Sequence, residues 1–135
     1  MDLQKAMFIS AAGLRVQNNR LRVIYENIAN KDSISNTDTG TPYRRKIVNF
    51  QNVLDRELGV YAPQASKIEF DKSEFGTKYD PGNPHANAEG YVQTTNVNGL
   101  IEMMDMAQAQ RSYQSNINAL EASRKIATMT LELLR

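Results

Sequence analysis

The chain has 135 residues, no cysteine and a net charge of +1 at neutral pH. Its length fits one domain with a modest core, and its balanced charge argues against nucleic acid or acidic lipid as the main partner. Without cysteine the chain forms no disulfide and no thiolate metal site. No apolar run approaches the roughly 18 residues of a membrane span, so an integral membrane protein is not expected.

The N-terminal segment, residues 2–29, contains no proline and one glycine, and Asp2 is placed to cap a helix that begins near Leu3. At 100° per residue, its apolar side chains form two stripes on opposite faces. The first stripe contains Leu3, Met7, Leu14, Leu21, Tyr25 and Ile28, and the second contains Phe8, Ile9, Ala12, Val16 and Val23. This helix is therefore expected to contact neighbours on two sides.

The apolar run at residues 7–14 resembles the hydrophobic part of a secretory signal peptide. However, Asp2 lies ahead of the run, Arg15 follows it directly, and there is no Ala-x-Ala cleavage site. A cleaved signal is therefore not expected, and a chain that leaves the cytoplasm would need another route.

The last third of the chain, residues 96–135, has no proline, and no glycine after Gly99, which predicts one long helix. A heptad seam runs along it through Met103, Met106, Gln110, Tyr113, Ile117, Leu120, Arg124, Ala127, Leu131 and Leu134. A second stripe contains Ile101, Met104, Ser115, Ala119, Ala122, Ile126, Met129 and Leu133. A helix of roughly 38 residues spans about 57 Å, whereas a compact domain of this size is only about 35 to 40 Å across. The molecule is therefore expected to be elongated or part of an assembly.

The two helices are expected to pair as an antiparallel coiled-coil hairpin, with the heptad seam against the first stripe of the N-terminal helix. Such a hairpin buries one stripe per helix and leaves the second exposed, and a long exposed apolar stripe predicts an interaction surface. We therefore expect the large apolar residues of both stripes to form the assembly interface, with the second stripes supplying the contacts that the intramolecular pair cannot, and the terminal segments to become ordered on association. The alternative, a self-contained helical bundle, requires a third long helical pattern, which the middle of the chain does not contain.

The middle of the chain predicts turns and short strands. Residues 30–42 form a polar loop, residues 43–50, 67–71 and 90–95 are candidate strands, residues 52–58 are a candidate helical turn, and residues 79–84 are a turn. The fold expected is mainly α, a single elongated domain with a helix at 1–30, an irregular segment with short strands at 31–95 and a helix at 96–135. The basic cluster Arg44, Arg45 and Lys46 is expected to be a solvated strand face.

The residue types needed for catalysis are not arranged for it. His85 is the only histidine and lies in a loop rich in proline and asparagine, and no serine has a histidine at helical spacing to act as its base. Glu102 and Asp105 lie where negative charge favourably meets a helix N-terminus. We therefore expect no enzyme activity, no cofactor and no metal.

Two groups of residues carry a resemblance to a known family. The first is Asn27-Ile28-Ala29-Asn30, followed after a polar loop by Tyr43-Arg44. The second includes Pro81, Gly82 and Pro84 in the run YDPGNP, then Gly90-Tyr91-Val92, Asn96-Val97-Asn98 and the run RSYQSN at residues 111–116. Both resemble the bacterial flagellar rod and hook protein family, and the second is similar to its proximal-rod members. Ile28 replaces the usual leucine of that family, and residues 31–41 and 51–78 carry no match.

The resemblance implies that the terminal helices pack as a coiled coil and that subunits stack into the rod, a tube that crosses the periplasm in the flagellar basal body and transmits motor torque. It implies copies of the chain, other rod proteins and the adaptor between rod and membrane ring as partners. It also implies transient passage through the flagellar type III export apparatus, without a cleaved signal.

Two alternatives remain open for the function. One is another rod or hook paralogue, and the other is a cytosolic coiled-coil adaptor or export chaperone, which would be a stable, discrete oligomer. Two readings also remain for the motif at the end of the first helix. Asn27 and Asn30 fix the exit angle of the chain, or Asn30 is an ordinary C-cap and Asn27 is solvated.

Overall fold

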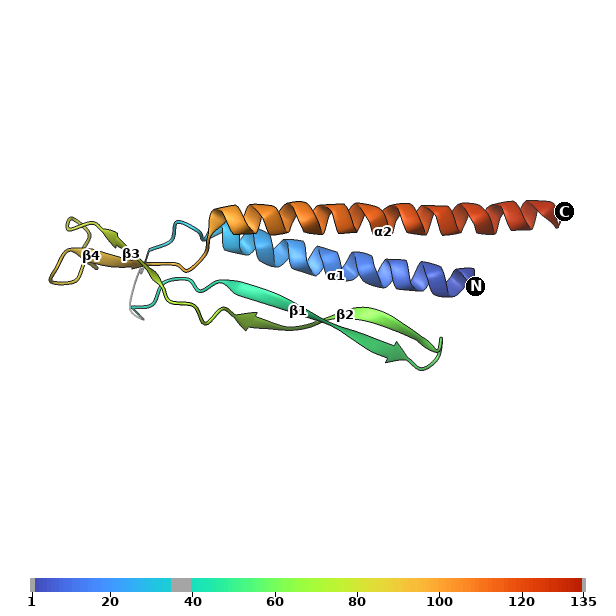
Figure 1. The fold of residues 1–135 in the computed structure, drawn as a ribbon, viewed down its shortest axis with the longest axis horizontal. Coiled ribbons are helices and arrows are strands. Elements are labelled where there is room, and N and C mark those ends of the chain that lie inside the picture. The colour runs from blue at the N-terminus through green and yellow to red at the C-terminus, as the bar shows by residue number, and fades with distance from the viewer. Residues whose placement is uncertain (1, 35–39, 135) are drawn as a thin grey trace.

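The computed structural model describes residues 2–34 and 40–134. Its elements are α1 (Leu3–Ala29), β1 (Lys46–Asp55), β2 (Val60–Phe70), β3 (Gly76–Tyr79), β4 (Tyr91–Thr94) and α2 (Gly99–Leu133). Figure 1 shows that the molecule is elongated: α1, α2 and the β1–β2 hairpin run side by side along one axis, and the β3–β4 lobe lies beyond the end of the helices. In these described parts of the chain, neither helix has the length and apolar character of a membrane span.

Side chains next to the helix ends explain where the helices begin. The Asp2 carboxylate accepts a hydrogen bond from the backbone N–H of Gln4 at the start of α1. The Asn98 side chain accepts hydrogen bonds from the N–H groups of Leu100 and Ile101 at the start of α2. Both satisfy backbone donors that have no partner inside the helix.

The two helices pack antiparallel, and the contacts between them fix the register. Gly13 lies against Asn116 and Asn27 bonds to Glu102, while Arg20 forms an ion pair with Asp105. The three α1 residues are seven apart, so they lie on one face. A Cβ atom on Gly13 would come 2.8 Å from Asn116 Oδ1, so the helices lie close together here and a larger residue would displace the Asn116 amide.

The face of α2 that packs inward coincides with only part of the predicted apolar seam. Glu102 and Ala109 are fully buried, whereas their neighbours Met103 and Gln110 are exposed, Met103 by 59%. The buried or half-buried positions alternate by four and three residues: Glu102, Met106, Ala109, Tyr113, Asn116, Leu120, Ser123 and Ala127. Every second position of this row is thus small or polar. The predicted seam contains the other half of the row, Met106, Tyr113, Leu120 and Ala127, and a search for apolar spacing missed Glu102, Ala109, Asn116 and Ser123.

The β1–β2 hairpin is the main feature that the sequence did not predict. Lys46 is opposite Phe70, Asp55 is opposite Val60, and the register shifts between Val48 and Phe50. Residues 52–55 belong to β1, so the predicted helical turn at 52–58 is wrong. The turn closes with Gly59 at a φ of +62°, a conformation in which glycine has no steric penalty.

The hairpin packs on α1 and covers its second apolar stripe. Ala12, Val16 and Val23 are each at most 5% exposed, and the hairpin residues Leu54 and Ala62 lie across from this face. The expectation that this stripe stays exposed in a single chain is therefore wrong. Helix α1 is the central layer, with α2 on one side and the hairpin on the other (Figure 1).

The expected fold class, mainly α with an irregular middle, is also wrong. The four strands have 10, 11, 4 and 4 residues and form two antiparallel sheets, β1–β2 and β3–β4. The fold is α+β. The candidate strands at 43–50, 67–71 and 90–95 overlap β1, β2 and β4, but the full length of β1 was not predicted. This strand carries apolar residues on both faces, so the alternation that marks a half-buried strand is absent.

Candidate functional site

The side chain of Asn27, near the end of α1, is the centre of a buried polar cluster. Its Nδ2 donates to the carbonyl oxygen of Lys46 (2.9 Å) and to Glu102 Oε2 (3.2 Å). Its Oδ1 accepts from the Tyr43 hydroxyl (2.9 Å) and from the Lys46 N–H (3.0 Å). Asn27 is 1% exposed and makes all four hydrogen bonds that a side-chain amide allows. The reading in which Asn27 is solvated is therefore wrong.

These contacts explain how the hairpin is held on the helices. The Asn27 amide bonds both the N–H and the C=O of Lys46, as a neighbouring strand would in a hydrogen-bonded pair. It thereby gives hydrogen-bond partners to the backbone N–H and C=O of Lys46, the first residue of β1. Lys46 Nζ also forms a 2.9 Å ion pair with Glu26, one residue earlier on α1. We call Asn27, Tyr43, Arg45, Lys46 and Glu102 the polar junction.

Arg45 connects the hairpin to α2. Its guanidinium bonds Glu102, whose side chain is 1% exposed, and forms ion pairs with Asp105 (3.2 Å) and Asp71 (3.4 Å). Burial acts to lower the pKa of Arg45, but the hydrogen bond and charge of Glu102 outweigh it and hold that pKa above its ordinary value. The expectation that this basic cluster is a solvated face is wrong for Arg45, which carries the only positive charge placed to neutralise Glu102 within residues 2–34 and 40–134.

The segment after β2 is held by two residues of the sequence motifs, Arg44 and Asn96. Arg44 Nη1 donates to the carbonyl oxygens of Asp71 (2.7 Å) and Ser73 (3.0 Å), and the guanidinium lies 4.2 Å from the Phe75 ring centroid. Asn96 Nδ2 donates to Ser73 Oγ (2.9 Å), and its Oδ1 accepts from the backbone N–H of Arg45 (2.7 Å). The chain leaving β2 and the chain entering α2 are thus tied to the start of β1.

Two pKa values are shifted around these contacts. The pKa of Tyr43 rises to about 12, first because of burial and then because of the negative charges of Glu26 and Glu102, so the hydroxyl stays protonated and donates to Asn27. The pKa of Asp71 is lowered, first by the hydrogen bond from the Ser73 N–H, with smaller contributions from the Ser73 hydroxyl and Arg45.

The lowered pKa of Asp71 predicts a loss of stability in acid. Its carboxylate stabilises the fold above its ordinary pKa near 3.8, and this stabilisation is lost as the pH falls through the lower pKa of the folded state. Urea unfolding at pH 7 and pH 3 is expected to show a smaller acid loss for Asp71→Asn than for the natural chain, because asparagine still accepts from Ser73 but does not titrate. Equal losses in both proteins would contradict this role of Asp71.

The remaining motif residues shape turns. Asn30 is the C-cap of α1, and its Nδ2 donates to the carbonyl oxygen of Glu26 (2.8 Å). Gly90 has a φ of +83°, and a Cβ there would come 2.9 Å from the Tyr79 ring, which packs edge-on against Tyr91 with centroids 5.3 Å apart. Pro81, Gly82 and Pro84 lie in the exposed turn between β3 and β4, Ile28 is half-buried and Ala29 is the exposed last residue of α1.

The residues predicted to form an assembly interface fall into three groups in the single chain. Val16 and Val23 are buried beneath the chain's own hairpin. Half-buried positions are Leu3, Met7, Phe8, Leu14, Leu21, Ile28, Met106, Tyr113, Ile117 and Leu120. Exposed positions are Ile101, Met103, Met104, Ile126, Met129, Leu131, Leu133 and Leu134. The exposed members therefore all belong to α2 or to its C-cap, Leu134.

Sequence reasoning missed Arg45, Glu102 and Asp71 as parts of the site. Arg45 directly precedes β1, Asp71 directly follows β2 and Glu102 lies on α2. Arg45 is 26 residues from Asp71 and 57 from Glu102 along the chain, and no local spacing connects them. The one signal was an acidic pair, Glu102 and Asp105, on a helix face that also carries apolar residues.

Comparison with known proteins shows to which family the chain belongs. Residues 88–133 match the family model described as flagellar basal body rod FlgEFG protein C-terminal. The chain is 44% identical to the flagellar basal-body rod protein FlgC of Agrobacterium fabrum, covering 98% of this chain and 96% of that protein. It is 36% identical to FlgC of Bacillus subtilis (93% of each chain) and 38% identical to FlgC of Salmonella typhimurium (98% of each chain). The chain belongs to the flagellar basal-body rod protein family.

Membership in this family shows in which assembly the polar junction is found. The chain is a structural subunit of the bacterial flagellar rod, located in the basal body, and it assembles with other rod proteins. Within the subunit, the motif residues Asn27, Tyr43, Arg44 and Asn96 all hold β1 and its surroundings against the helices. The motif therefore maintains the internal geometry of a rod subunit.

Proposed function

We propose that this rod subunit polymerises through the exposed side of α2, contributing to the proximal part of a tubular shaft that transmits motor torque. Its partners are copies of itself, other rod proteins and the adaptor between rod and membrane ring. It reaches the rod through the flagellar type III export apparatus without a cleaved signal, and it has no catalytic role. The position in the rod, the adaptor partner, the export route and the absence of catalysis go beyond family membership and follow what the sequence resemblance implies.

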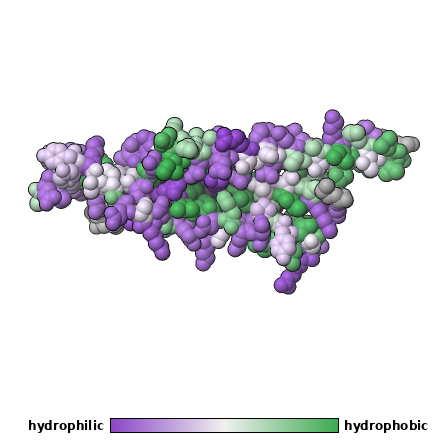
Figure 2. Space-filling view, viewed as in Figure 1, coloured by the Kyte–Doolittle hydropathy of each residue, from purple (hydrophilic) through white to green (hydrophobic). Residues whose placement is uncertain are grey.

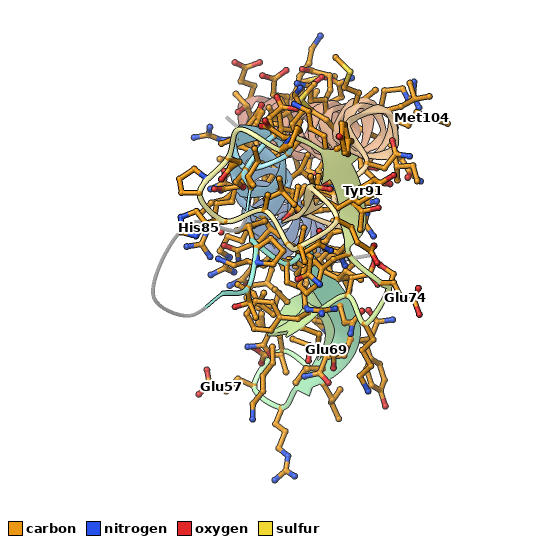
Figure 3. The ribbon with its side chains drawn as sticks, turned by 90° about the vertical axis from the view of Figure 1, so that its left-hand side faces the viewer. Glu57, Glu69, Glu74, His85, Tyr91 and Met104 are labelled. Atoms are coloured by element: carbon orange, nitrogen blue, oxygen red, sulfur yellow. The ribbon has the colours of Figure 1, made fainter. Side chains whose placement is uncertain are left out.

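The observation that carries the proposal is the stripe on α2 that the subunit leaves uncovered. We call it the outer stripe. All of its members are exposed: Ile101, Met104, Ser115, Ala119, Ala122, Ile126, Met129 and Leu133. Met104 is 66% exposed, and Figure 3 shows it at the outer side of α2, pointing away from α1 and the hairpin.

Two features of the stripe favour helix-to-helix contact. Large apolar residues occupy both ends, and the small residues Ser115, Ala119 and Ala122 occupy the middle, where they would let another helix approach closely. An apolar stripe that follows a helix for its whole length marks an interaction site on a protein. The stripe is therefore suited to a partner helix lying along α2.

A charge placed in the stripe tests the proposal. Met104→Glu is expected to abolish swimming in soft agar while changing the free energy of unfolding by less than about 0.5 kcal/mol, because the side chain makes few contacts inside the subunit. Gln110→Glu introduces the same charge on another exposed face of α2 and is expected to leave swimming unchanged. Normal swimming of the Met104→Glu strain would overturn the assignment of the outer stripe to assembly.

A further inference from the structure

The register of the helix pair leaves the end of α2 without a partner. Gly13 is opposite Asn116 and Asn27 is opposite Glu102, and in both pairs the residue numbers add to 129, which places Leu3 opposite Ile126. Residues 127–134 therefore extend past α1 by roughly eight residues, or about 12 Å. Figure 1 shows α2 continuing beyond the N-terminal end of α1. We call residues 127–134 the C-terminal overhang.

The overhang carries four large apolar residues, while Thr128 and Glu132 form a polar side. Met129, Leu131, Leu133 and Leu134 are 51%, 67%, 86% and 80% exposed, and at 100° per residue they point in different directions. Figure 2 shows hydrophobic residues at this tip of the molecule. Exposed apolar side chains gathered at one place mark an interaction site. The overhang therefore requires a partner surface that covers these four side chains.

The same molecule contains such a site between α1 and the hairpin. A groove with a volume of about 440 Å³ is lined by Phe8, Ala12 and Val16 on α1 and by Leu54 and Ala65 on the hairpin, among others. Its α1 wall runs from residue 8 to residue 19, about 16 Å along the helix axis. The groove is thus long enough for the two turns of the overhang. We call it the α1–hairpin groove.

Charges at the groove match those of the overhang. Arg15 and Asp55 line the groove, and neither forms an ion pair within the described residues 2–34 and 40–134. The overhang carries Glu132, and Lys125 precedes it by two turns on the exposed side of α2. The groove and the end of α2 thus each carry one charge of each sign, so Glu132 can pair with Arg15 while Lys125 pairs with Asp55.

We propose that the C-terminal overhang of one subunit occupies the α1–hairpin groove of a second copy. The inference rests on the proposed self-assembly and names the contact that carries it. The overhang cannot enter its own groove, because α2 is a continuous helix that leads away from it (Figure 1). Two different surfaces meet, so the contact is heterologous and each added copy presents a new groove and a new overhang. A contact of this kind propagates along a shaft.

Disulfide trapping in flagellated cells tests the contact, since the natural chain has no cysteine. Leu54→Cys combined with Leu133→Cys is expected to give covalent dimers and higher multimers after oxidation, as is Leu54→Cys with Met129→Cys, one turn along the helix. The matched control is Tyr79→Cys with Leu133→Cys. Tyr79 is 62% exposed and lies in β3, at the opposite end of the molecule, so this pair is expected to stay monomeric.

The outcomes separate this contact from the proposed function. Intact basal bodies whose Leu54 variants cross-link no more than the control would overturn the groove contact and leave polymerisation through α2 standing. If cysteine-to-lysine cross-linking at Leu54→Cys captured a different rod protein and no second copy, the proposed occupant would be wrong. Normal swimming of Met104→Glu, by contrast, counts against the proposed function and not against the groove.

Discussion

Replacing Asn27 with leucine is expected to destabilise the subunit by about 3–5 kcal/mol, because buried polar groups left without partners cost about 1–3 kcal/mol each. Leucine has a similar size but no amide. The Tyr43 hydroxyl and both backbone groups of Lys46 would lose their partner, and Glu102 would lose one of its donors. The loss is a large share of the roughly 5–15 kcal/mol that stabilise a typical domain. Thermal and urea unfolding, followed by circular dichroism, measure it.

Asn18→Leu provides the matched control for this substitution. Asn18 lies on the exposed face of the same helix, so the same chemical change is expected to alter stability by no more than about 0.5 kcal/mol. Strains carrying Asn27→Leu are expected to swim poorly, whereas those carrying Asn18→Leu swim normally. If the two variants unfolded at the same urea concentration, the Asn27 amide would not hold the hairpin on the helices.

The second large effect is expected at the Arg45–Glu102 pair. Removing one partner of a buried ion pair costs about 3–5 kcal/mol, because the other charge stays buried without compensation. Glu102→Ala leaves the guanidinium of Arg45 with Asp71 and Asp105, both only partly buried. Arg45→Ala leaves Glu102 with the Asn27 amide alone among the described residues. Arg45→Ala is therefore expected to be strongly destabilised, and Glu102→Ala less so, because Arg45 keeps two carboxylate partners.

A double-mutant cycle measures the interaction energy of Arg45 with Glu102 apart from their contacts with other residues of the polar junction. The combined Arg45→Ala/Glu102→Ala variant is expected to be more stable than the sum of the two single losses predicts, by roughly 1–3 kcal/mol. Glu121→Ala, on the exposed side of α2, controls for loss of a glutamate from this helix. Additive losses in the cycle would show that Arg45 and Glu102 act independently.

The helices could be predicted from the sequence because their signals are local. Asp2 marked the start of α1, and the absence of proline and of further glycine after Gly99 marked the length of α2. The face that each helix buries could not be predicted by the same means. The interface alternates large residues such as Tyr113 and Leu120 with small or polar ones such as Glu102 and Asn116, and a rule that follows large apolar side chains finds only the first kind.

The hairpin and the polar junction depend on contacts that are distant along the chain. Arg45 and Glu102 are separated by 57 residues, and each is unremarkable in its own segment: one lies in a basic cluster, the other in the first turn of a helix. The family resemblance identified Asn27, Tyr43, Arg44 and Asn96 as a motif without saying what joins them. Their common role became visible only once β1 was placed against α1.

The polar contacts between α1 and α2 have a mechanical consequence for a shaft. Two helices joined by repeating leucines can slide by one heptad and recover equivalent contacts, whereas a buried polar group has only one matching position. Here Asn27 must face Glu102, Arg20 must face Asp105 and Gly13 must face Asn116. A slip of one heptad along the axis would break all three contacts at once. We therefore expect the two helices of each subunit to resist sliding past one another when the shaft is under torsional load.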